Sequence, residues 1–144
     1  MRCGNQDPIM APHNVYRCKG DDKWVSIAVA TDDEWKALCK AMGDPEWAKD
    51  EAFSDVYGRW KNRAKLDKYI SEWTIEHTHY EVMNILQNVG VAAIPSFSAE
   101  EILSDPHVKA RGKLTEVEHP VMGKKVVITP PWKMSETPAK IWKA

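Results

Sequence analysis

The stretch "SDPHVKARG", residues 104–112, places an acid, a histidine and two bases close together. These are the side chains that general acid–base catalysis uses. Helix formation explains the same residues, because Asp105 is a typical N-cap and Pro106 suits the first helical position. Lys109 and Arg111 lie near the C-terminal end of this helix, where positive charge interacts favourably with the helix dipole. Gly112 suits helix termination. We therefore interpret the stretch as the punctuation of a helix, and nothing near His107 in the sequence demands a ligand.

The pair His77 and His79 has the H-x-H spacing that binds metals when it lies on a strand. Here Thr78 has the features of a helix N-cap, because Glu81 follows it at the spacing of a capping box. Two imidazoles that flank a cap diverge, so we do not predict a metal site. His13 and His119 each lie beside a proline and are interpreted as turn residues.

Possible nucleophiles are equally poorly supported. Neither Ser96 nor Ser98 lies in the G-x-S-x-G pattern of a hydrolase, and Ser98 is already assigned to a helix cap. Cys3, Cys18 and Cys39 are odd in number and contain no C-x-x-C pair, which argues against a zinc knuckle or a redox dithiol. We expect three reduced thiols in a cytoplasmic protein, with Cys39 in the core.

The N-terminal segment "RCGNQDPIMAPHNVY" precedes the first predicted strand without any periodicity. Gly4 permits close approach of the backbone to a ligand, and the amides of Asn5 and Gln6 offer both donors and acceptors. On composition alone, the segment fits a ligand-contacting loop and an unstructured start equally well. Phosphate-binding glycine patterns are absent from the sequence.

Composition and charge restrict the classes to which this protein can belong. The chain has 144 residues, of which 43% are hydrophobic and 28% charged, which is typical of a globular domain. The net charge of -1 argues against a nucleic-acid partner, because such proteins usually carry a basic surplus. No apolar run approaches the ~18 residues of a membrane span, so we expect no membrane partner.

Helix signals recur at regular points of the chain. Capping boxes begin at three positions, each followed by a glycine at helix-ending distance: Thr31 and Gly43, Thr78 and Gly90, Ser98 and Gly112. A fourth helix is predicted within residues 62–77, where apolar residues recur at i, i+3, i+4 and i+7.

Strand signals flank these helices. Residues 14–20 and 23–30 are rich in β-formers and are joined by a polar glycine turn, which predicts a hairpin. Residues 91–98 form a short apolar run, and residues 113–120 and 124–131 predict a second hairpin. We therefore predict an α+β fold, with a small antiparallel sheet (two hairpins plus a short strand) packed with four or five helices. Trp132, in the segment after the last strand, is the best candidate for an exposed or interfacial ring.

Three runs in this order resemble the smaller domain of the class III CoA-transferases. The runs are the opening through "GDPEW", then "NVGVAAIPSFSAEEILSDPHVKARG", and then "VEHPVMGKKVVITPPWKMSETP". The family includes formyl-CoA and carnitine CoA-transferases and α-methylacyl-CoA racemases. The chain departs from the pattern at Ala92 and Ala93, where many members have a proline.

The resemblance implies that residues 1–129 are a small domain and that residues 130–144 are a linker returning to a large domain. In the family, the large domain carries the catalytic aspartate, so we assign no catalytic residue, no metal and no covalent cofactor to this chain. Coenzyme A thioester is then the substrate of a parent enzyme, and this segment covers its active-site cleft. The early loop, Gly4, Asn5 and Gln6, borders the acyl-CoA site.

The resemblance also implies an interlocked homodimer, and we expect this chain alone to be inactive. Two alternatives stay open at this stage: a stand-alone binding or interaction module that has kept the fold, and a fragment of an acyl-CoA racemase.

Overall fold

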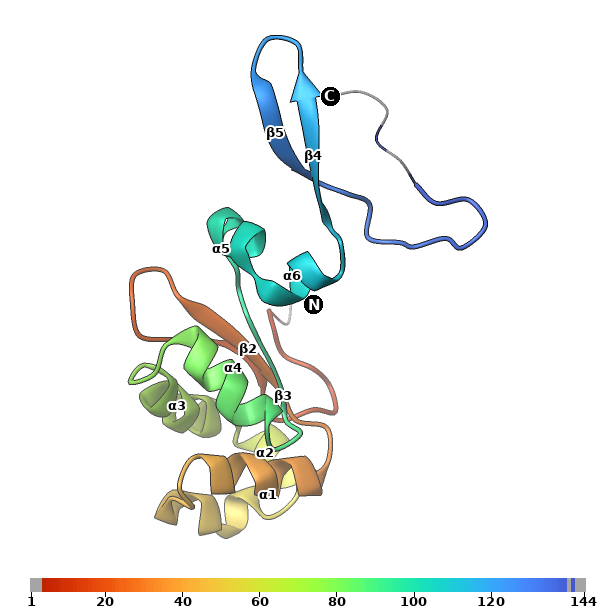
Figure 1. Ribbon diagram of the computed structural model, residues 1–144. Helices are drawn as coiled ribbons and strands as arrows, with labels where there is room; N and C mark the ends of the chain where they lie inside the picture. Colours follow the sequence, from red (N-terminus) through yellow and green to blue (C-terminus); the bar gives the residue numbers. More distant parts are fainter. Residues whose placement is uncertain (1–3, 140, 142–144) are drawn as a thin grey trace. The chain divides into compact units, whose positions relative to one another are not determined.

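The computed structural model describes residues 4–139 and 141, and the chain divides into two compact units, Met1–Ser96 and Phe97–Ala144. Both units combine helices with antiparallel strands, so the α+β prediction is confirmed (Figure 1). Cys3 and the last residues of the predicted linker, 140 and 142–144, lie outside the described residues.

The first unit is built on a three-stranded antiparallel sheet with the order β1-β2-β3. The strands are β1 (His13–Arg17), β2 (Trp24–Ala28) and β3 (Ala92–Pro95). β1 and β2 form the predicted hairpin, whose turn contains Gly20 at φ 112° and Asp22 at φ 49°. The register places Val15, Ser26 and Ile94 side by side across the three strands.

Four α-helices complete this unit: α1 (Asp32–Ala41), α2 (Val56–Lys61), α3 (Arg63–Thr74) and α4 (His79–Gln87). The predicted capping boxes at Thr31 and Thr78 are both formed, and Gly43 and Gly90 both have positive φ. Helix α3 matches the helix that apolar spacing predicted within residues 62–77.

The chain between α1 and α3 contains short helical elements that the sequence analysis does not predict. Two short 3₁₀ turns, Glu46–Lys49 and Glu51–Phe53, precede α2. These pieces are too short to show an apolar period, although Asp55 marks the start of α2 by accepting a hydrogen bond from Gly58 N.

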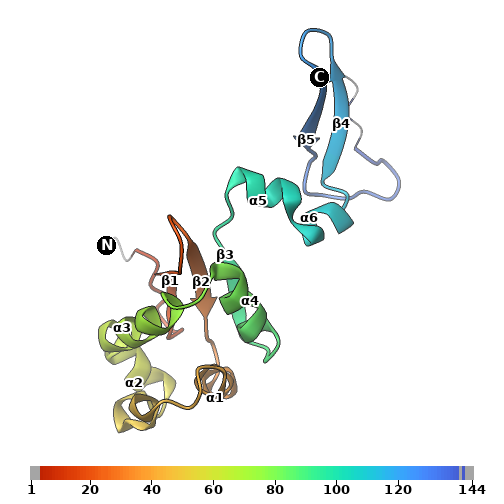
Figure 2. The same cartoon turned by 60° about the vertical axis from the view of Figure 1, so that its left-hand side comes forward.

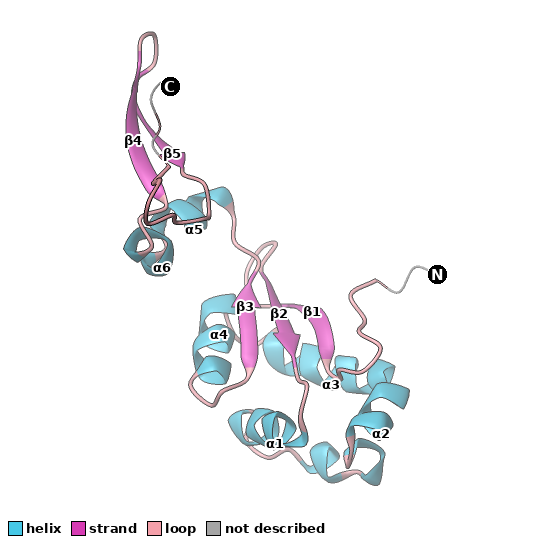
Figure 3. Cartoon of the chain, turned by 90° about the vertical axis from the view of Figure 1, so that its right-hand side faces the viewer, coloured by secondary structure: helices cyan, strands magenta, loops and turns pink. Residues whose placement is uncertain are grey.

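The helices α3 and α4 pack on one face of the sheet, as Figures 2 and 3 show from two sides. Side chains alternate along each strand, so Tyr16, Val25, Ile27 and Ala93 point into the resulting core. Cys18 and Cys39 are also buried, which confirms Cys39 as a core residue.

Arg59 is fully buried beside this core and is held by four groups. Its guanidinium donates to Asp32 Oδ1 at 2.6 Å, to Ala11 O at 3.1 Å and to Phe53 O at 3.3 Å. It also lies 5.1 Å from the ring centroid of Trp35. The buried cation therefore joins α2 to α1 and to the chain before β1.

The second unit contains α5 (Ala99–Ser104), α6 (Pro106–Ala110) and the hairpin of β4 (Leu114–His119) and β5 (Gly123–Ile128). The predicted helix of residues 98–112 is divided, because Pro106 disfavours a helical residue before it and Asp105 is extended (ψ 128°). The Asp105 carboxylate accepts a hydrogen bond from Val108 N and so caps α6, as its position before Pro106 predicts. Among the described residues of the second unit, only Asp105 is buried.

Candidate functional site

The face of the three-stranded sheet opposite α3 and α4 is hollowed. The hollow has a volume of about 520 Å³. Its floor is formed by side chains that alternate with the core residues, and its lining includes Val15, Ser26, Ala28, Ala92 and Ile94. Ile94 is 55% exposed there. The floor is thus apolar with one hydroxyl, and Asn5, His13 and Gln87 bring polar groups to its border.

The 4–6 loop (Gly4, Asn5, Gln6) meets this hollow at Asn5. His13 Nδ1 lies 2.7 Å from the carbonyl oxygen of Asn5. Because a carbonyl oxygen only accepts, Nδ1 carries the proton. Gly4 has φ +61°, a conformation that favours glycine. The loop is therefore joined to the first residue of β1.

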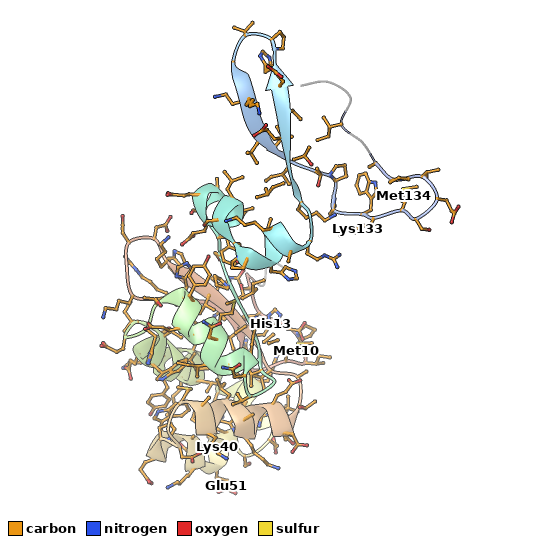
Figure 4. All side chains as sticks on the ribbon, in the orientation of Figure 1. Met10, His13, Lys40, Glu51, Lys133 and Met134 are labelled. Carbon is orange, nitrogen blue, oxygen red and sulfur yellow. The ribbon has the colours of Figure 1, made fainter. Side chains whose placement is uncertain are left out.

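The residues after the 4–6 loop are held as well. Asp7 Oδ1 accepts from Ile9 N at 2.8 Å and from Met10 N at 2.9 Å, and these bonds lower the pKa of Asp7. Trp60 Nε1 donates to Asp7 O at 3.2 Å. Met10 and His13, both labelled in Figure 4, line one small cavity together with Asp7. These bonds hold the chain between the 4–6 loop and β1.

The Asp67 cluster is a part-buried group of polar side chains that no pattern in the sequence predicts. Asp67, on α3, accepts from Tyr16 Oη at 2.6 Å and from Asn14 Nδ2 at 3.0 Å. Burial first, and then the charge of Asp67, raises the pKa of Tyr16. The cluster fixes β1 on α3. Asp67 lies 51 positions after Tyr16 and 53 after Asn14, so no local pattern indicates these contacts.

The other candidate residues are explained by structure. Ser98 accepts from Glu101 N as a helix cap. His77 Nδ1 donates to Trp73 O at 2.9 Å. Burial raises the pKa of both Cys18 and Cys39 to about 11, so neither thiol is an activated nucleophile. Within residues 4–139 and 141, no three His, Cys, Asp or Glu side chains gather as metal ligands.

Among the described residues, no helix combines the length and the apolar character that a membrane span requires.

The sequence and the fold have clear relatives. The model of CoA-transferase family III matches residues 1–144. A succinyl-CoA–D-citramalate CoA-transferase of Chloroflexus aurantiacus is 36% identical over 85% of this chain and 30% of its own length. A formyl-CoA:oxalate CoA-transferase of Rhodopseudomonas palustris is 29% identical over 97% of this chain and 34% of its own length.

A solved structure of a CAIB/BAIF family protein from Brucella suis has a TM-score of 0.79 and 28% identity, over 96% of this chain and 35% of that one. The chain therefore belongs to CoA-transferase family III. It spans about a third of the length of these relatives, and 15% of a probable CoA-transferase of Mycobacterium tuberculosis that is 36% identical over 81% of this chain.

Proposed function

We propose that this chain is the small-domain portion of an enzyme that transfers CoA between carboxylic acids through acyl-CoA thioesters. The observation that carries the proposal is the family match over residues 1–144 together with relatives about three times as long. Residues 1–129 form the small domain, and residues 130–144 lead back to a large domain. The catalytic aspartate belongs to that large domain, so this chain alone is inactive.

The 4–6 loop borders the acyl-CoA site in this proposal. Its support is geometric: Asn5 lines the 520 Å³ hollow, and His13 holds the Asn5 carbonyl at the border. The amides of Asn5 and Gln6 suit neutral hydrogen bonding to a thioester ligand, because each offers donors and an acceptor. The loop then orients the substrate and limits access of water, while proton transfer and covalent chemistry occur on the large domain.

The proposal includes partners and location. Exposed apolar side chains of the first unit, Ile9 at 71%, Tyr57 at 68% and Ile94 at 55%, suit contact with a large domain. The parent enzyme is an interlocked homodimer in the cytoplasm, where thiols such as Cys18 and Cys39 stay reduced.

The loop assignment is tested by titrating the ¹⁵N-labelled chain with CoA. We expect saturable shifts of the backbone amides of Asn5 and Gln6, which the double substitution Asn5→Ala and Gln6→Ala abolishes. Asn84→Ala, on the exposed side of α4, is the matched control and leaves the shifts of the loop unchanged. Unchanged loop amides at saturating CoA count against the loop as a binding element.

The fragment assignment is tested by activity and mass. The 144-residue chain is assayed for CoA transfer from formyl-CoA to oxalate and from succinyl-CoA to D-citramalate, the pairs named for its relatives. Turnover by this chain alone contradicts the proposal. The native gene product is sized in cell extract: a species much larger than 16.4 kDa supports a longer parent chain, and a species of that mass supports the stand-alone module.

A further inference from the structure

The hollow of about 520 Å³ on the first unit follows β2, the middle strand of the sheet. Figure 3 shows β2 between β1 and β3. Two rows of side chains cross the strands on this face: His13, Ala28 and Ala92 in the first row, and Val15, Ser26 and Ile94 in the second. The residues on β2 are small, while Val15 and Ile94 stand on either side of Ser26. The hollow is therefore a trough whose floor is β2 and whose walls belong to β1 and β3.

The shape of the trough is fixed by the core behind it. Val25 and Ile27 alternate with the floor residues along β2 and are fully buried. A shift of register by one residue would move them out of the core, so core packing holds the floor in place. Gln87 Nε2 donates to Ala93 O at 2.8 Å and joins the end of α4 to β3. A preformed hollow of this volume suits a small-molecule group.

The lining of the trough favours an uncharged ligand. Among the described residues that line it, none is an aspartate, glutamate, lysine or arginine. His13 lines it, but its Nδ1 already donates to Asn5 O at 2.7 Å. Ser26 offers a hydroxyl, which makes a hydrogen bond but carries no charge. A carboxylate placed here loses water without gaining a cation, which costs affinity. An aliphatic group gains affinity, because it leaves water for contact with Val15 and Ile94.

We propose that the trough binds the acyl group of the thioester and selects a neutral aliphatic acyl group over one that ends in a carboxylate. The inference rests on the proposed function, in which Asn5 borders the acyl-thioester site, and it adds the class of acyl group that the site accepts. The thioester carbonyl lies at the end of the trough formed by Asn5 and His13. The acyl chain follows β2 past Ala28 and lies between Val15 and Ile94.

The test uses the ¹⁵N-labelled 144-residue chain and thioesters of N-acetylcysteamine, which carry an acyl group without the nucleotide of CoA. The 4-methylpentanoyl and succinyl thioesters are a matched pair, because they share one arrangement of non-hydrogen atoms and differ in charge. We expect saturable shifts of the Ser26, Ala28 and Ala92 amides with the 4-methylpentanoyl thioester. The succinyl thioester binds at least about tenfold more weakly. From acetyl to butanoyl to hexanoyl, each added methylene lowers the Kd by up to about fourfold.

A substitution that adds a cation tests the selection directly. Ile94 is 55% exposed on β3, an edge strand of the sheet, where a lysine is well tolerated. Ile94→Lys shifts the ratio of the two Kd values toward the succinyl thioester by at least about tenfold, because an ammonium group then meets the carboxylate. The matched control is Ile75→Lys, which lies outside the lining at 40% exposure and keeps the preference of the parent chain.

A substitution that fills the trough tests its location. Ala28→Leu occupies the floor and weakens the 4-methylpentanoyl thioester at least about tenfold, because the larger side chain takes the space of the acyl group. The amides of Val25 and Ile27 in the same spectra check that the sheet is intact. Ala110→Leu makes the same change at an exposed position of α6 and leaves the Kd unchanged.

Two results overturn the inference. One is equal affinity for the 4-methylpentanoyl and succinyl thioesters, and the other is the absence of saturable shifts at Ser26, Ala28 and Ala92 with every thioester. A parallel titration with CoA reports on the proposed function through the amides of Asn5 and Gln6. If CoA shifts these loop amides while the trough ignores the thioesters, the inference fails alone. If the trough selects the neutral thioester while CoA leaves the loop unchanged, the trough is supported and the loop assignment fails.

Discussion

His13 connects the 4–6 loop to the sheet through a single side-chain hydrogen bond, 2.7 Å from Nδ1 to Asn5 O. We predict that His13→Leu loosens the loop, because the carbonyl loses its donor while a leucine fills similar space. His13→Asn restores order, because its amide nitrogen stands where Nδ1 stood. Heteronuclear NOE values of Asn5 and Gln6 measure the effect: lower in His13→Leu, near the parent value in His13→Asn.

The same comparison separates positioning from binding. Asn5 contributes only its backbone oxygen to this bond, so Asn5→Ala keeps the loop ordered while it removes the amide group from the hollow. Equal NOE values in the parent chain and His13→Leu contradict the positioning role of His13, whether or not the loop binds CoA.

Arg59 is fully buried, so replacing it should lower the stability of the fold. Arg59→Leu leaves the carbonyls of Phe53 and Ala11 without their donor, and each such loss costs about 1–3 kcal/mol. Asp32 is half exposed and regains water, so its loss adds little. We predict a fall of about 3 kcal/mol in the free energy of unfolding.

Urea unfolding followed by circular dichroism measures this change, with the m-value checked for constancy. Arg63→Leu is the control, because Arg63 donates to one carbonyl, that of Trp60, near the surface. Similar losses for both variants contradict a special role for the buried cation.

At the level of elements, helix starts were the best predicted feature. The boxes at Thr31, Thr78 and Ser98 depend on residues three apart, so the sequence contains the whole interaction. The start of α6 also depends on neighbouring residues, because Asp105 caps the helix and Pro106 occupies its first position. The cluster at Asp67 and the bonds of Arg59 join residues far apart in the chain, and no local pattern announces them. The hollow on the sheet was missed for the same reason, since it depends on strand register.

The capping box of α4 gives a prediction about pH. Hydrogen bonds from Thr78, backbone first, lower the pKa of Glu81 below its usual 4.5. A depressed pKa in the folded state stabilises the fold above pH 4.5, and that contribution is lost as the pH falls through the folded value. Glu81→Gln keeps an acceptor but has no charge to lose.

Urea midpoints of the parent chain and Glu81→Gln across an acid series measure this. We expect the parent chain to be the more stable above pH 4.5 and the two midpoints to converge below it. A constant difference across the series contradicts the role of the Glu81 charge. Glu76→Gln, in the turn before Thr78, is the control for the loss of one carboxylate outside the capping box.

At the scale of the whole molecule, the two units differ in how they are stabilised. Every residue of the hydrophobic core belongs to the first unit, from Tyr16 to Ala93. In the second unit, Val126 and Ile128 are 54% and 60% exposed on the hairpin. Two-stranded hairpins have little stability alone, so the amides of β4 and β5 should exchange faster than those of β1 and β2.

A chain ending at Ser96 tests this division directly. We predict that residues 1–96 keep the fold, because the core cluster needs no residue beyond Ala93. Its amide spectrum should coincide with that of the full chain over β1 to β3. Ending the chain at Gln87 is the control and should unfold it, since Val91 and Ala93 are buried and β3 is lost. If the chain ending at Ser96 also unfolds, the second unit contributes to the stability of the first, and the assignment of a self-sufficient core to residues 1–96 is wrong.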